Sequence, residues 1–107
     1  MMLKTITRIP VAHYSNLKSR SGYTVKIDNQ EIALFKVSNG NVYAIDNHSP
    51  HPKGGVLSEG LVSGEYVFCP VYDWKISLVD GMVQAPDTGH VKTFEVQVEE
   101  DIIFIVI

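Results

Sequence analysis

The sequence contains a single cysteine, Cys69, among its 107 residues. One thiol cannot form a disulfide within the chain, and this scarcity is typical of proteins from a reducing compartment. It also restricts metal chemistry, because zinc sites and iron–sulfur clusters draw heavily on thiolate ligands. Any metal site in this chain would therefore depend largely on histidine.

Long hydrophobic runs and an excess of basic charge are also missing. No stretch approaches the roughly 18 apolar residues of a membrane-spanning helix, and the N-terminus lacks the pattern of a cleaved signal peptide. The formal net charge is −3, which provides no basic stripe for the phosphates of nucleic acids or anionic membranes. We expect a cytoplasmic protein that binds neither nucleic acid nor membranes.

The remaining composition is that of a globular protein. Hydrophobic residues make up 45% of the chain and charged residues 20%, which allows a buried core. A chain of this length accommodates one such core. We expect a single domain over residues 1–107.

Short runs of β-branched and aromatic residues recur about every eight to twelve positions between turn residues, a spacing typical of an antiparallel sandwich or barrel. Residues 10–17 are expected to form a turn or one helical turn. The final run, Ile102 to Ile107, is apolar throughout, which predicts a strand covered on both faces or an edge used by a partner. The predicted strands are residues 4–9, 22–27, 31–37, 41–45, 65–69, 74–79, 93–99 and 102–107.

Two irregular segments interrupt this pattern. The first, Asp46 to Gly60, contains the sequence NHSPHPKGGVLSEG and is too long for a simple connection. The second, Cys69 to Trp74, reads CPVYDW. Long ordered loops in small domains usually have a function, so these segments are the candidate site.

Together the two segments resemble the Rieske iron–sulfur family. In that family a C-P-H loop followed by L-S-E-G, and a C-P-x-H-x-W loop, supply two cysteines and two histidines to a [2Fe–2S] cluster. The resemblance implies an all-β fold: a Rieske-like antiparallel sandwich or barrel of three small sheets with two protruding loops. It covers nearly the whole chain.

The family's ligand positions fall on Ser49, His51, Cys69 and Tyr72, so two of the four carry hydroxyl groups. Hydroxyl oxygens ionise less readily than thiols and are poorly matched to sulfide-bridged iron. We therefore predict a degenerate cluster site with no bound cofactor, no metal and no catalytic residue. The Tyr72 ring is expected to fill the vacated space, with its hydroxyl bonded to Ser49 or to the loop backbone.

Other interpretations remain open from the sequence. The four positions could still hold a cluster, with or without His48, which would make the chain a ferredoxin-like electron carrier. His48, His51, Cys69 and His90 could instead bind zinc, in an interaction module of another oxidoreductase. Against this, the histidines could be ordinary loop residues. Cys69 is expected to pack in the core, and Trp74 to anchor the second segment.

Among Rieske-like proteins, a short chain with these two replacements resembles the small subunit of assimilatory NAD(P)H-dependent nitrite reductase. In that family the large subunit is understood to hold flavin, siroheme and an iron–sulfur cluster and to reduce nitrite to ammonia in nitrate assimilation. The resemblance implies an accessory subunit that docks onto the large catalytic subunit. The charged loop residues Lys53, Glu59 and Asp73 are candidates for that contact through charge complementarity.

Overall fold

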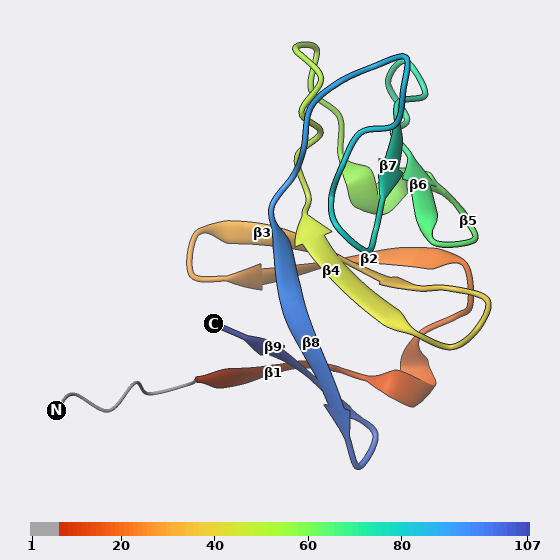
Figure 1. Cartoon of the computed structure of the whole chain (residues 1–107). Helices are drawn as coiled ribbons and strands as arrows, with labels where there is room; N and C mark the ends of the chain where they lie inside the picture. The colour runs from red at the N-terminus through yellow and green to blue at the C-terminus, as the bar shows by residue number, and fades with distance from the viewer. Residues whose placement is uncertain (1–6) are drawn as a thin grey trace, which may run out of the picture.

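The computed structural model describes residues 7–107, and its regular elements are antiparallel strands and two short 3-10 turns (Figure 1). This confirms the prediction of an all-β fold. No helix within residues 7–107 is long and apolar enough to cross a membrane. The elements are β1 (Arg8–His13), η1 (Tyr14–Asn16), β2 (Ser21–Ile27), β3 (Gln30–Lys36), β4 (Val42–Asp46), η2 (Leu57–Glu59), β5 (Leu61–Ser63), β6 (Tyr66–Phe68), β7 (Lys75–Ser77), β8 (Thr93–Glu99) and β9 (Ile102–Val106).

The strands form a six-stranded sheet of order β1-β9-β8-β4-β3-β2 and a three-stranded sheet of order β5-β6-β7. β8 connects the two halves of the larger sheet. It pairs with β4 through Thr93 and Phe94 and with β9 through Glu95 to Glu99. The three small sheets expected from the sequence are therefore present, and two of them are continuous through this long strand (Figure 1).

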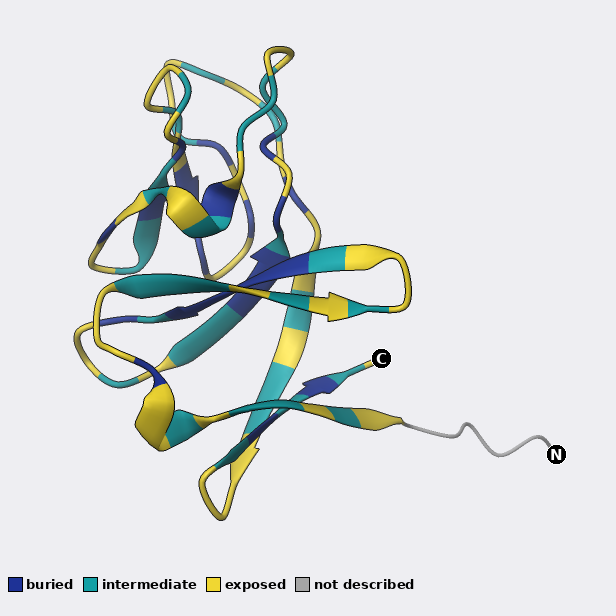
Figure 2. Cartoon of the chain, turned by 180° about the vertical axis from the view of Figure 1, so that it is seen from behind, coloured by how far each residue is buried: buried dark blue, intermediate teal, exposed yellow. Residues whose placement is uncertain are grey.

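β3 separates two hydrophobic cores. Because successive side chains of a strand point to opposite faces, Ile32 and Leu34 enter one cluster while Ala33 and Phe35 enter the other. All four are essentially inaccessible to solvent. Buried positions gather in the middle of the molecule and exposed ones at the hairpin turns (Figure 2). The core that contains Phe35 also packs against the smaller sheet, and so supports the candidate site.

The first strand lies later in the chain than predicted. β1 continues through Pro10 to His13 and pairs with β9, where the sequence predicted a turn. Residues 4–6 of the predicted strand lie outside the described residues. Proline is tolerated because β1 is an edge strand whose register shifts between Pro10 and Ala12.

β9 is not an edge strand, so that interpretation of the C-terminal run was wrong. It lies between β1 and β8, and Ile103 and Ile105 are fully buried. On its other face, the Arg8 guanidinium lies 4.2 Å from the centre of the Phe104 ring. The run is therefore apolar throughout because other side chains cover both faces of β9 at least in part.

Candidate functional site

The first loop, residues 47–60, and the second loop, residues 69–74, lie at the end of the molecule opposite the β8–β9 turn (Figure 1). Asn47, fully buried, fixes the base of the first loop. Its side-chain oxygen accepts a hydrogen bond from the Ser58 amide at 2.8 Å, and its amide nitrogen donates to Thr24 Oγ1 at 3.2 Å. The second loop is closed by the Cys69 amide, which donates to the Trp74 carbonyl at 2.8 Å.

Ser49 and Cys69 approach each other across the backbone of Gly55. A Cβ at Gly55 would lie 2.8 Å from Cys69 Sγ and 3.5 Å from Ser49 Cβ, so the loops could not pack this closely with a larger residue there. Cys69 is fully buried, which confirms the prediction that it packs in the core. Its thiol lies 3.9 Å from the Gly54 carbonyl oxygen.

His51 and Tyr72 also lie together, in an aromatic group with Trp74. The rings of His51 and Tyr72 stack with their centres 4.5 Å apart, and the Trp74 ring meets His51 edge to face at 4.6 Å. Trp74 packs against the core, as predicted. The structure thus gathers all four ligand positions expected from the resemblance at one end of the molecule.

The predicted orientation of Tyr72 was wrong. Its side chain is 66% exposed, rather than filling a space between the loops. Tyr72 and Asp73 have φ angles of +63° and +51°, and two consecutive left-handed residues turn the phenol outward over the His51 ring. The Ser49 hydroxyl instead accepts a hydrogen bond from the His51 amide at 3.2 Å. Such backbone strain costs on the order of 1 kcal/mol or more per residue and is often found at functional sites.

The histidines do not form the zinc site considered above. The Lys53 amide donates to His51 Nδ1 at 2.9 Å, which leaves the proton of the neutral ring on Nε2. His48 Nδ1 lies 3.2 Å from Asp46 Oδ1, within its own segment. In residues 7–107 no three or more His, Cys, Asp or Glu side chains are grouped closely enough to hold a metal ion.

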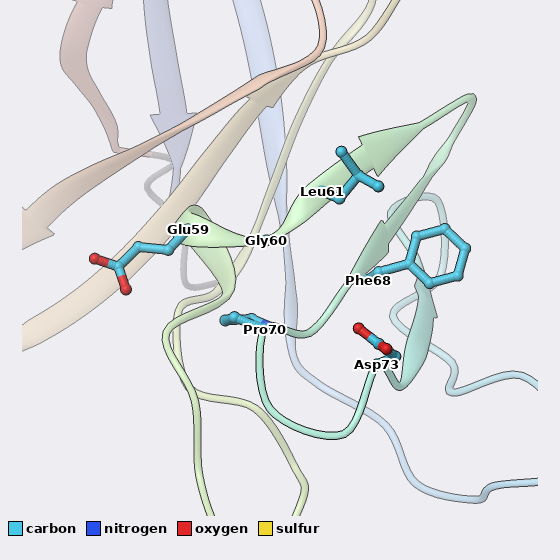
Figure 3. A pocket seen from close by; sticks show the side chains of 6 residues that line it. All are labelled: Glu59, Gly60, Leu61, Phe68, Pro70 and Asp73. Carbon is cyan, nitrogen blue, oxygen red and sulfur yellow. The ribbon is translucent and has the colours of Figure 1, made fainter.

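Two of the three predicted partner-binding residues, Glu59 and Asp73, line the same groove, of about 500 Å³ (Figure 3). The third, Lys53, lies exposed on the first loop and does not line it. The apolar part of the groove was not predicted from the sequence. Leu61 is 72% exposed beside the buried Val62, and two adjacent apolar residues give no alternating sequence pattern from which this exposure could be predicted. The lining residues are Glu59, Gly60, Leu61, Phe68, Pro70 and Asp73.

Among curated proteins, the chain is similar to segments of larger enzymes. It is 29% identical over 102 residues to the oxygenase component of 3-ketosteroid-9-alpha-monooxygenase from Mycolicibacterium smegmatis, covering 90% of this chain and 26% of that protein. It is 33% identical over 87 residues to the nitrite reductase [NAD(P)H] large subunit of Klebsiella oxytoca, covering 78% of this chain and 9% of that subunit. The chain therefore spans about a quarter or less of these relatives.

Among solved structures, the similarity extends over whole chains. A protein provisionally described as a nitrite reductase NADPH small subunit is 30% identical, with a TM-score of 0.80 and coverage of 92% of this chain and 97% of the other. Two structures at 24% identity share the fold. They are an NADH-dependent nitrite reductase small subunit, also a provisional description, from Mycobacterium tuberculosis (TM-score 0.85, 96% of each chain) and the ferredoxin of carbazole 1,9a-dioxygenase from Nocardioides aromaticivorans (TM-score 0.84, 92% and 96%).

The Rieske-like [2Fe–2S] domain family matches residues 8–106. This corrects the prediction that the chain carries no cofactor, because the matching family is one defined by a cluster. The side chains at the four ligand positions do not fit that group as a set: a hydroxyl and an exposed phenol accompany one thiol and one imidazole. On the extent of the match and the shared fold, this chain belongs to the Rieske-like [2Fe–2S] domain family.

Proposed function

We propose that this chain is the small subunit of an NAD(P)H-dependent nitrite reductase and acts by docking onto the large catalytic subunit. The observation that carries the proposal is the whole-chain similarity, at 30% identity and a TM-score of 0.80, to the protein provisionally described as a nitrite reductase small subunit. The similarity covers 92% of this chain and 97% of the other. On this proposal, nitrite reduction takes place on the large subunit.

The similarity to a large subunit supports the same partner. In Klebsiella oxytoca a segment of the nitrite reductase large subunit aligns with 78% of this chain. When two domains belong to the same polypeptide, the linker between them keeps each at a high effective concentration relative to the other. A separate chain has no such tether, so it needs a specific surface to offset the entropy lost on association.

The loop end of the molecule offers such a surface. Tyr72 is exposed and held by stacking on His51, so little side-chain freedom would be lost on binding. Tyrosine is enriched among the residues that dominate the energy of protein interfaces. Docking through this end requires no group bound between the two loops.

Co-expression tests the proposal directly. The nitrite reductase large subunit of the same organism would be affinity-tagged and expressed with this chain untagged. We expect the two to co-elute in a fixed ratio after a wash at moderate salt. Omission of the tagged subunit controls for adsorption to the resin, and elution of the large subunit alone would contradict the proposal.

A second candidate is a ferredoxin-type electron carrier, which the fold similarity to the carbazole dioxygenase ferredoxin favours. This function needs a bound [2Fe–2S] cluster. Iron and acid-labile sulfide in a two-to-two ratio per chain, after anaerobic expression with ample iron, would favour this candidate over the first.

We further propose that residues 1–107 act as one domain in the cytoplasm. The single cysteine, typical of a reducing compartment, supports this setting. A single cooperative unfolding transition with coincident fluorescence and circular dichroism midpoints would support one domain, and two separated transitions would contradict it.

A further inference from the structure

The groove between the second loop and β5 combines acidic and apolar side chains. Figure 3 shows the Asp73 carboxylate turned toward the space beside Pro70, with Leu61 and Phe68 on the adjoining strands. Glu59 lies on the other side of Pro70 in this view. The Asp73 carboxylate and an exposed leucine thus share one concave surface, and Glu59 also lines it, with its carboxylate pointing away from Asp73 in Figure 3.

The two carboxylates lack a cation of their own in the described part of the chain. None of the ion pairs within residues 7–107 includes Glu59 or Asp73. The nearby Lys75 ammonium group is placed over the Tyr66 ring, 4.3 Å from its centre, and 5.9 Å from the centre of the Phe68 ring. The groove therefore presents negative charge that an arginine or lysine of a partner could neutralise.

The groove is also preformed. A Cβ at Gly60 would lie 2.3 Å from the Phe68 carbonyl oxygen, so the glycine allows the start of β5 to approach the end of β6. Asp73 lies in the loop that the hydrogen bond from the Cys69 amide to the Trp74 carbonyl closes at 2.8 Å. A site whose walls are fixed before binding loses less entropy when the partner arrives.

We propose that this groove, lined by residues 59–61, 68, 70 and 73, receives a segment of the nitrite reductase large subunit that carries a basic residue beside an apolar one. The basic group pairs with the Asp73 carboxylate, with Glu59 adding negative charge at the margin of the groove, and the apolar side chain packs on Leu61 and Phe68. The inference rests on the proposed function and specifies its contact surface. A second copy of this chain is a poorer occupant, because each copy carries a net charge of −3.

The test is the affinity of the purified chain for the purified large subunit, measured by isothermal titration calorimetry at low and high NaCl. Asp73→Asn combined with Glu59→Gln removes both charges, and asparagine tolerates the left-handed backbone. We expect Kd to rise about tenfold or more and its salt dependence to weaken. Leu61→Ser should raise Kd about fivefold through the loss of apolar contact.

Two variants at the opposite end of the molecule are the matched controls. Glu100→Gln removes one exposed charge in the β8–β9 turn, and Val98→Ser removes an apolar side chain that is 48% exposed. Both should bind within about twofold of the wild type. Circular dichroism would verify that every variant is folded.

The outcomes separate this inference from the function on which it rests. Binding by the wild type with unchanged Kd and salt dependence in the groove variants overturns the groove and leaves the subunit role intact. No binding by the wild type overturns both. Self-association of the wild type that the groove variants abolish, with affinity for the large subunit unchanged, would identify a second copy as the occupant and overturn the inference.

Discussion

At the scale of single residues, Gly55 sets the separation of the two loops. It has a φ of +129° and faces Cys69 Sγ, whereas Gly54, with a φ of +78°, has no atom within 4 Å of its Cβ position. Gly54→Ala therefore measures backbone strain without a clash, and Gly55→Ala adds both a steric clash and a larger backbone strain. We predict that Gly55→Ala lowers the free energy of unfolding by about 1–3 kcal/mol more than Gly54→Ala. Equal losses in urea denaturation would contradict the packing described here.

A second prediction concerns the hydrogen bond that the Tyr43 hydroxyl donates to the Glu65 carboxylate. This bond, followed by burial, raises the pKa of Tyr43 above its ordinary value of 10.0. The folded state thus holds the proton more tightly than the unfolded state. The stabilisation is present below pH 10 and is lost as the pH rises through the folded-state pKa.

We predict that Tyr43→Phe lowers the free energy of unfolding by about 1 kcal/mol at neutral pH, and that the difference from the wild type shrinks in alkaline solution. Tyr66→Phe is the matched control, since the Tyr66 hydroxyl makes no side-chain hydrogen bond within the described residues. Urea denaturation across the alkaline range measures both. A difference for Tyr43→Phe that does not change with pH would contradict the assignment.

Single residues were placed correctly from the sequence where hydrophobicity determines whether a side chain is buried. Cys69 and Trp74 are the first and last residues of the second loop and pack in or against the core, as expected of such side chains. Tyr72 was placed wrongly because its exposure depends on two consecutive left-handed residues, Tyr72 and Asp73. Neither residue type requires that conformation, so the sequence carries no signal for it.

At the scale of elements, β9 has a central place in the larger sheet. Ile105 is fully buried in the core that contains Ile32 and Leu34. Ile107, just beyond the strand, is 61% exposed. We predict that Ile105→Ala costs about 2–5 kcal/mol of unfolding free energy and that Ile107→Ala stays within about 0.5 kcal/mol of the wild type. Similar losses in the two variants, by chemical denaturation, would contradict the central position of β9.

The elements predicted well are those with a complete alternating pattern. β8 begins and ends at the predicted residues because Phe94, Val96 and Val98 alternate with polar positions. β5 was missed because three residues are too few to establish a period. The first strand was predicted to end at Ile9, before Pro10, since a proline normally breaks a paired strand and its edge position cannot be seen in the sequence.

At the scale of the whole molecule, the two irregular segments indicated where the site lies, and the structure brings them together. The groove beside them was only half predicted. Glu59 and Asp73 were identified from their loop positions, but Leu61 and Phe68 enter the groove because β5 and β6 pair, with Leu61 opposite Phe68. Contacts that depend on strand pairing of such short segments are set by tertiary structure.

The central claim, a specific complex with the nitrite reductase large subunit, is tested most directly by sedimentation velocity on the two purified proteins. We expect a boundary that sediments faster than either protein alone and contains both chains, with its amplitude saturating at a fixed ratio. Two independent boundaries at every mixing ratio, with both proteins folded, would contradict it.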